Sequence, residues 1–292
     1  DPLADAEVVV RARMVNQRLA VLPLEGNAIV VHPAPDDGHE LTIWVSTQMP
    51  HGFRRQAAEL FGLESERVRV IAPHVGGGFG GKAGVLAEHT VAIGAARALG
   101  RPVSWVETRT ENLVSMPHGR GQVGYYELGL TRDGRITGMR ARVVADAGAY
   151  AGFGGALAIG PTRMMSQGVY AMGAIGFSAA VVVTNTTPMG AFRGAGRPEA
   201  TAYLERLMDL AADELGMDPA EIRRRNFLDP AAFPLTTIPG MRYDVGDYDL
   251  PLREALRIAD YTKLREEQAA RREAGDPVQL GIGISVYVEI TA

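Results

Sequence analysis

The chain has 292 residues, with 30 Lys and Arg against 34 Asp and Glu, which gives a formal charge of −4. Hydrophobic residues make up 46 % and charged residues 22 %, a balance typical of a folded protein and not of a disordered one. Because cysteine is absent, this chain cannot form disulfides, ligate an iron–sulfur cluster or use a cysteine nucleophile. Interspersed charges argue against nucleic-acid binding, and no apolar run approaches the ~20 residues of a membrane span. We expect a cytoplasmic protein.

The first third of the chain predicts a small sheet with helices. Alternating apolar residues predict strands over 27–32 and 41–46, paired as a hairpin or meander. A helix is expected from Pro50 until Gly62, and a strand over Val68–Ala72. A glycine-rich loop, Pro73–Lys82, then leads into an Ala-rich helix expected from about Ala83 to Leu99.

The remainder alternates strands and helices. Strands are expected over 103–107, 122–130 and 135–146, the last two joined by a turn at 132–134. The apolar run Ala179–Val183 predicts a strand buried on both faces. After a second loop over 186–199, an amphipathic helix places five apolar residues on one face and three acidic residues off it: Tyr203, Leu204, Leu207, Ala211 and Leu215, with Glu205, Asp209 and Asp213. A short helix over 219–226, a charged helix over 251–272 and a strand-like alternation over 281–289 follow. The mixture predicts an α+β fold, with mixed sheets and packed helices.

The ends of the chain favour a piece of a longer protein. The sequence lacks an initiator Met and stops at Ala292, directly after the strand-like alternation. Natural termini usually fray in polar residues instead.

The residues of the glycine-rich loop, taken alone, are compatible with several functions. Five of the six residues from Gly76 to Gly81 are glycine, and a strand–loop–helix unit of this kind can hold phosphate with bare backbone N–H groups. The loop matches the dinucleotide fingerprint, but so would almost any glycine run. It also matches a P-loop up to Ala83, which stands where a Ser or Thr would hold Mg²⁺. Two interpretations therefore remain open: a nucleotide-binding protein, and a bend that packs strand against helix without any ligand.

A third interpretation comes from several segments found in one order along nearly the whole chain. They are Asn16–Arg18, Pro23–Glu25, Trp44–His51, Val68–Lys82, Asp146–Tyr150, Thr184–Thr186, Ala191–Glu199, Arg225–Phe227 and Gly281–Ser285. Together they resemble the molybdenum-cofactor (large) subunit of the xanthine dehydrogenase, aldehyde oxidase and aerobic carbon-monoxide dehydrogenase family. Several ordered motifs are more specific than one glycine loop, so this interpretation carries the most weight. A cofactor-free structural module of the same fold is the remaining alternative.

The resemblance implies a molybdenum atom held by the dithiolene of a molybdopterin, in the cytosine dinucleotide form, with no protein metal ligand. Gln48 would hydrogen-bond a molybdenum oxygen, and Phe79 would help to form the substrate funnel. Gly77, Gly78 and Gly80 would bring bare backbone beside the cofactor, and the second loop would be formed by Ala191, Phe192, Arg193 and Gly194. Arg193 would orient cofactor or substrate through its fork of donors; the alternative is an ion pair with an acidic neighbour such as Glu199. Gln48, Phe79 and Arg193 are the expected catalytic residues.

Three departures from the family pattern narrow the expected chemistry. Gly194 stands where the copper-containing carbon-monoxide dehydrogenases carry a copper-binding cysteine, which implies a glycine-loop, non-copper type. Ala83 stands where purine oxidisers carry a glutamate, which makes xanthine a poor substrate. The family's catalytic Gly-x-Gly-Glu motif does not occur in the sequence, and Glu289 does not match it, so the general base stays unassigned.

The resemblance therefore implies part of a molybdenum hydroxylase that uses water to hydroxylate an aldehyde or an N-heterocycle. Residues 1–240 would form the first molybdopterin-binding domain, and 241–292 a linker and the beginning of the second. Electrons would pass to iron–sulfur and FAD groups in partner subunits of a hetero-oligomer. We expect this chain to be inactive on its own.

Overall fold

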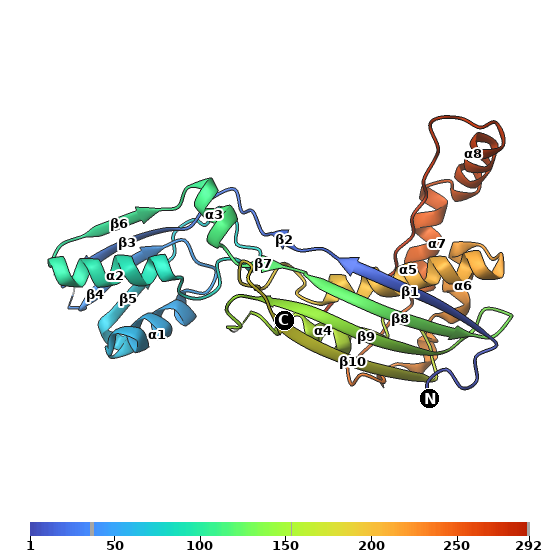
Figure 1. Ribbon diagram of the computed structural model, residues 1–292, viewed down its shortest axis with the longest axis horizontal. Coiled ribbons are helices and arrows are strands. Elements are labelled where there is room, and N and C mark those ends of the chain that lie inside the picture. The colour runs from blue at the N-terminus through green and yellow to red at the C-terminus, as the bar shows by residue number, and fades with distance from the viewer. Residues whose placement is uncertain (36–37, 153, 291–292) are drawn as a thin grey trace.

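Two lobes, each with its own sheet and hydrophobic core, lie end to end in the computed structural model (Figure 1). The structure describes residues 1–35, 38–152 and 154–290. This arrangement of mixed sheets and packed helices confirms the expected α+β class.

The first lobe contains a four-stranded sheet in the order β5-β4-β3-β6. Its strands are β3 (Ala28–Pro33), β4 (Leu41–Val45), β5 (Val68–Ile71) and β6 (Val103–Val106). Strand β3 pairs antiparallel with β4 and β6, which confirms the expected hairpin, whereas β4 and β5 are parallel. The helices α1 (Pro50–Phe61) and α2 (Ala87–Leu99) join the sheet in one core that includes Ile43, Phe53 and Ile93. The short 3₁₀ helix η1 (Ser65–Arg67) precedes β5.

The predicted start of the Ala-rich helix was wrong by four residues. Helix α2 begins at Ala87, with Leu86 as its N-cap residue. Gly84 has φ +88°, a left-handed conformation that cannot continue a right-handed helix. The glycine-rich loop therefore does not run directly into a helix N-terminus.

The second lobe is built on a longer sheet in the order β1-β8-β9-β10. Its strands are β1 (Val8–Asn16), β8 (Gln122–Leu130), β9 (Ile136–Gly148) and β10 (Ala174–Val183). Three helices, α4 (Ile159–Met164), α5 (Arg197–Leu215) and α6 (Pro219–Asn226), pack with this sheet. The predicted β8–β9 hairpin and the amphipathic α5 are confirmed, while β1, α4 and α3 (Arg109–Ser115) were not predicted.

One burial prediction in the second lobe was wrong, and one buried acidic residue was not foreseen. Strand β10 lies at the edge of the sheet, where β9 is its one partner among the described strands, and Val181, Val182 and Val183 are exposed. An apolar run predicts a strand but does not reveal its place in the sheet. Glu205 was placed off the apolar face of α5, yet it is buried, because Arg223 on α6 forms an ion pair with it across the helix contact.

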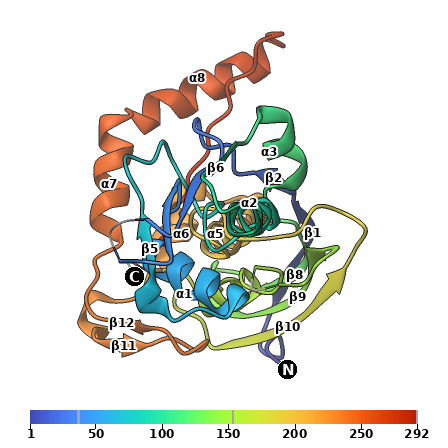
Figure 2. The ribbon, with the colours of Figure 1, turned by 90° about the vertical axis from the view of Figure 1, so that its left-hand side faces the viewer.

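The C-terminal part also differs from the prediction. The single charged helix is two helices, α7 (Asp249–Ile258) and α8 (Tyr261–Glu273), separated by Asp260 at φ +51°. Figures 1 and 2 show that they lie along the outside of the molecule. The segment over 281–289 belongs to no named strand; its backbone is held instead by Arg223 and Glu205. None of the helices in the described residues is long and apolar enough to span a membrane.

Short elements join the two lobes and position the loops between them. The two-residue strands β2 (Leu19–Ala20) and β7 (His118–Gly119) pair at the junction, and His118 also bridges Met189. The remaining small elements are η2 (Pro230–Ala232), β11 (Leu235–Thr236) and β12 (Arg242–Tyr243). As a result, the glycine-rich loop of the first lobe faces the loop before α5 of the second.

Candidate functional site

The two predicted loops meet in one pocket of about 450 Å³. Its lining residues are Gln48, Gly78, Phe79, Gly80, Ala191, Phe192, Arg193, Gly194 and Ala195. The structure thus brings together eight of the nine predicted site residues from segments more than a hundred positions apart. The exception is Gly77, which lies behind Phe79: a Cβ atom built on Gly77 would be 2.9 Å from the Phe79 ring.

The close approach of the two loops requires glycine. A Cβ atom on Gly80 would lie 2.5 Å from the carbonyl oxygen of Ala191, and the φ of Gly80 is +102°. A Cβ atom on Gly78 would lie 2.7 Å from Oε1 of Gln48. Across the same contact, the N–H of Arg193 donates to the carbonyl of Phe79 at 2.9 Å. Side chains at these glycines would separate the lobes or close the pocket.

Gln48 is held through its oxygen, which leaves its amide nitrogen as a donor. Oε1 of Gln48 accepts a hydrogen bond from the N–H of Gly80 at 2.9 Å. The backbone N–H of Gln48 donates to the carbonyl of Lys82 at 3.2 Å. An amide fixed through its oxygen presents its N–H₂ group without adding charge.

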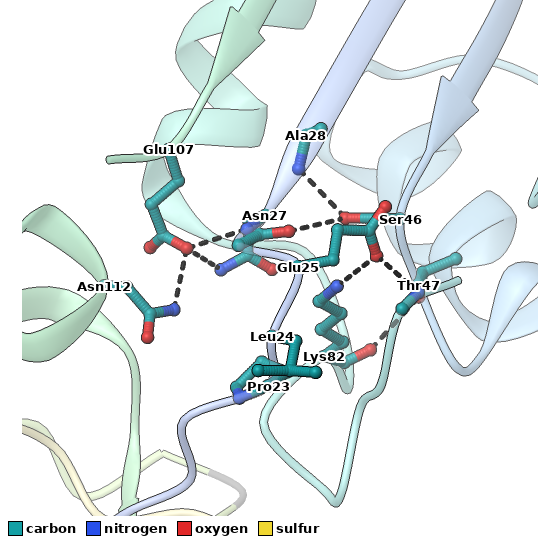
Figure 3. Close-up of polar contacts among 12 residues, drawn as sticks. Pro23, Leu24, Glu25, Asn27, Ala28, Ser46, Thr47, Lys82, Glu107 and Asn112 are labelled. Atoms are coloured by element: carbon teal, nitrogen blue, oxygen red, sulfur yellow. Dashed lines mark hydrogen bonds and ion pairs between the residues drawn. The ribbon is translucent and has the colours of Figure 1, made fainter. Parts of the chain in front are cut away.

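The glycine-rich loop is anchored from behind by Glu25 and Lys82 (Figure 3). Nζ of Lys82 is 2.6 Å from Oε2 of Glu25, and that oxygen also accepts the N–H of Gly76 at 2.8 Å. The carbonyl of Lys82 accepts the hydroxyl of Thr47 at 3.1 Å. Both ends of the loop are therefore held by one buried lysine and one carboxylate.

The position of the Lys82 side chain argues against the hypothesis that the loop is a P-loop. In a P-loop the lysine reaches the bound phosphates. Here the Lys82 side chain has 0 % exposure and is engaged by Glu25. It does not line the pocket.

The alternative role considered for Arg193 was wrong. Glu199 pairs with Arg120 instead, at 3.2 Å, and also accepts the N–H of Gly196 at 2.8 Å. Arg193 is exposed, and no side-chain partner for it is recorded in the described part of the chain. Its guanidinium is therefore available at the pocket.

Arg120 is a residue at this site that sequence reasoning missed. Its guanidinium donates to the carbonyls of Phe192 and Arg193 at 3.0 and 2.8 Å, and it lies 4.7 Å from the centre of the Phe192 ring. The sequence feature that could have indicated this residue is its position between two glycines, Gly119 and Gly121. A Cβ atom on Gly119 would lie 2.2 Å from Cβ of Phe192, so the backbone packs directly on the second loop.

The polar side chains among the lining residues are those of Gln48 and Arg193. The oxygen of Gln48 is already engaged by the N–H of Gly80, so both side chains offer N–H donors, and no carboxylate, imidazole or thiol is among the lining residues. Near the second loop, burial lowers the pKa of His118, which stays neutral at pH 7. Within the residues described, no group of three His, Cys, Asp or Glu side chains could hold a metal ion.

Two side-chain donors with no acidic group beside them suit an anionic organic group that carries its own metal ligands. The glycine cradle leaves room for a large group to reach the backbone, and the amide and guanidinium donors match electron-rich atoms. The fold and the site thus indicate a class: a protein whose two lobes form a pocket suited to an anionic organic group.

The comparisons with known proteins agree with this class. Residues 1–227 match the molybdopterin cofactor-binding domain family, and the chain belongs to that family. It is 38 % identical over 296 residues to the carbon monoxide dehydrogenase large chain of Hydrogenophaga pseudoflava, covering 98 % of this chain and 36 % of that one. It is 37 % identical over 294 residues to the nicotine 6-hydroxylase large subunit of Paenarthrobacter nicotinovorans, covering 99 % and 35 %.

A solved structure agrees as well. Quinoline 2-oxidoreductase from Pseudomonas putida 86 superposes with a TM-score of 0.88 at 32 % identity, over 94 % of this chain and 35 % of that one. The chain therefore spans about a third of the length of the relatives it matches.

A second, larger groove of about 550 Å³ lies away from this site. It runs between α7, α8 and the segment 280–287, and its lining is mainly aliphatic. Because few polar side chains converge on this groove, it is a poorer candidate for the functional site than the smaller pocket.

Proposed function

We propose that this chain is the cofactor-binding part of a molybdenum hydroxylase that uses water to hydroxylate an N-heterocycle or an aldehyde. The observation that carries the proposal is the convergence of Gln48, the glycine-rich loop and Arg193 on one pocket. The relatives named for nicotine and quinoline support an N-heterocycle as the first substrate class to test.

Each site residue then has a proposed role. When bound, the molybdenum cofactor supplies the redox centre. The Gln48 amide donates to an electron-rich atom near the metal, and the backbone at Gly78 and Gly80 lets the cofactor approach. The exposed Arg193 guanidinium orients an anionic or polar group. Phe79, 43 % exposed at the pocket, provides an apolar wall that restricts which substrates enter.

Several finer features belong to the same proposal. The glycine at position 194 supports a non-copper type, because a glycine has no side chain with which to ligate copper. We also propose the cytosine dinucleotide form of the cofactor, iron–sulfur and FAD partner subunits, and a cytoplasmic location. Residues 1–240 would be the first molybdopterin-binding domain, and the arm formed by α7 and α8 would lead into the second. The isolated chain would be inactive.

The test is molybdenum and pterin analysis of the holoenzyme that contains this chain, with Gln48→Glu as the key variant. Glutamate can still accept the N–H of Gly80, but it replaces the amide donor with a negative charge facing the anionic cofactor. We expect molybdenum occupancy to fall about tenfold, equivalent to about 1.4 kcal/mol. Gln56→Glu is the matched control, because exposed Gln56 also accepts one backbone N–H, from Val85 at 3.0 Å, outside the pocket.

Four outcomes would contradict parts of the proposal. A wild-type holoenzyme without molybdenum would overturn the function itself. Equal molybdenum occupancy in the two glutamate variants would overturn the role of Gln48. Turnover of quinoline or benzaldehyde with an artificial electron acceptor by the isolated chain would overturn its expected inactivity. ATP with Mg²⁺ should give no thermal stabilisation; a clear increase in the melting temperature would instead favour a nucleotide-binding protein.

A further inference from the structure

The side chain of Arg120 holds the second site loop by four separate contacts. Nη1 donates to the carbonyl of Phe192 at 3.0 Å and to Oε2 of Glu199 at 3.2 Å, while Nη2 donates to the carbonyl of Arg193 at 2.8 Å. The guanidinium carbon lies 4.7 Å from the centre of the Phe192 ring. Only the planar fork of an arginine can satisfy two successive carbonyls and a carboxylate together.

These contacts fix the direction of two successive peptide groups. In a trans peptide the C=O and N–H bonds point in opposite directions. The carbonyl of Phe192 points to Arg120, and the N–H of Arg193 accordingly donates to Phe79 on the other side. The carbonyl of Arg193 also points to Arg120, so the N–H of Gly194 points away from the guanidinium. Gly194 lines the pocket, and no acceptor for its N–H is recorded within the described ranges.

The contacts of Arg120 with the second loop are accompanied by two energetically unfavourable features. Arg120 has φ +68°, a left-handed conformation that is unfavourable for a residue with a Cβ atom. Glu199 is fully buried, and its second carboxylate oxygen has no partner among the described residues. Buried charge and local backbone strain persist where the surrounding structure enforces them, and they concentrate at functional sites.

We propose that Arg120, backed by Glu199, is a positioning residue that orients the Arg193–Gly194 peptide so that the Gly194 N–H donates to the anionic cofactor in the pocket. The inference rests on the proposed function and adds a donor that no side chain supplies. Arg120 does not line the pocket itself; it acts through the backbone of the second loop.

The variant that tests this role is Arg120→Lys. Lysine keeps a positive charge for Glu199 but has no fork with which to hold both carbonyls. Arg18→Lys is the matched control. Arg18 also joins a backbone carbonyl, that of Thr187, to a carboxylate, that of Asp146, but it does not contact the pocket-lining residues.

Three measurements on the holoenzyme distinguish positioning from general stability. In Arg120→Lys, amide hydrogen exchange at Arg193 should accelerate about tenfold, and molybdenum occupancy should fall by a similar factor, each equivalent to about 1.4 kcal/mol. The electron paramagnetic resonance signal of the remaining reduced molybdenum should shift, because a donor to its cofactor has moved. Arg18→Lys should match the wild type in all three measurements.

The outcomes separate this inference from the proposed function. Wild-type exchange, molybdenum content and resonance signal in Arg120→Lys would overturn the positioning role. Equal loss of molybdenum in Arg120→Lys and Arg18→Lys would overturn it as well, because the effect would then be general. A wild-type holoenzyme without molybdenum would overturn the proposed function, and the exchange comparison would still decide whether Arg120 orders the loop.

Discussion

Lys82 and Glu25 form an ion pair of 2.6 Å in which the lysine side chain is fully buried while the glutamate side chain is 36 % exposed. The two partners are therefore not equivalent. Glu25 can recover water contacts if its partner is lost, whereas Lys82 would keep a charge in a place that water does not reach. The pair closes the base of the glycine-rich loop, so its loss affects both stability and the site.

This asymmetry predicts that Glu25→Ala is more harmful than Lys82→Met. The first variant strands a buried ammonium group and should cost about 3 to 5 kcal/mol of unfolding free energy. The second fills the same volume without charge and should cost about 1 to 2 kcal/mol. Urea denaturation of both variants measures the difference. A greater loss in Lys82→Met would show that the burial of the lysine is not what limits stability here.

The two loops of the site could be predicted from sequence because their motifs resemble those of a known family, whereas their residues alone left several interpretations open. Gly78 and Gly80 are needed because a Cβ atom would lie 2.7 Å from Oε1 of Gln48 at the first position and 2.5 Å from the carbonyl oxygen of Ala191 at the second. Arg120 could not be assigned a role in this way. Its importance depends on which carbonyls face it, and that follows from how the two lobes pack.

Gly80→Ala should separate the two loops. Its Cβ atom would lie 2.5 Å from the carbonyl of Ala191, and φ +102° adds backbone strain. We expect molybdenum occupancy of the holoenzyme to fall at least about tenfold, equivalent to about 1.4 kcal/mol. Gly240→Ala is the control for strain alone, since its φ is +99° with nothing within 4 Å. If both variants lose the same amount of molybdenum, the contact with Ala191 is not what forms the site.

In the fold as well, some features could be predicted from nearby residues, whereas others depend on contacts between distant segments. The ends of α1 follow from Pro50 and from Gly62, which adopts the left-handed conformation that ends a helix. Strand β10 was predicted as a strand, but its position in the sheet was predicted wrongly. The apolar run at Val181–Val183 does not show which strands lie beside it. Only the pairing of strands decides which one becomes the edge.

His89 should make the first lobe sensitive to acid. Burial lowers the pKa of His89 from 6.5 to about 4, and the ring packs edge-on against Phe53 and Trp105. Between these two pH values the unfolded chain binds a proton that the folded chain does not. The free energy of unfolding should therefore fall by about 3 kcal/mol as the pH drops from 6.5 to 4, and this contribution should level off below pH 4.

Denaturation of wild type and His89→Asn at a series of pH values checks this contribution. Asparagine can still accept the N–H of Leu86, which donates to Nδ1 of His89 at 3.2 Å, but it does not titrate. The stability difference between the two proteins should shrink as the pH falls. Ile93→Val, in the same core, should lower stability equally at every pH. A constant difference for His89→Asn as well would show that His89 does not carry the effect.

Arg223 should prove the main link between the second lobe and the segment over 281–289. The fully buried guanidinium contacts Glu205 at 2.9 Å, Asp209 at 2.8 Å and the carbonyl of Ile284 at 3.0 Å. Tyr170 donates to the same Glu205 at 2.5 Å. Burial, reinforced by the Glu205 carboxylate, raises the pKa of Tyr170 well above its ordinary value, so its hydroxyl remains a donor.

Arg223→Met leaves the buried carboxylate of Glu205 without its counter-charge and should cost about 3 to 5 kcal/mol. Adding Glu205→Gln should restore part of that loss, because a neutral amide needs no counter-charge. Chymotrypsin should cleave after the exposed Tyr287 at least about tenfold faster in Arg223→Met, an effect equivalent to about 1.4 kcal/mol. Arg225→Met, which removes an exposed pair with Glu221 on the same helix and a hydrogen bond to the carbonyl of Asp133 at 2.7 Å, should cost about 1 kcal/mol or less and leave cleavage unchanged. Equal cleavage rates in the two methionine variants would mean that the segment is held by its apolar contacts and not by Arg223.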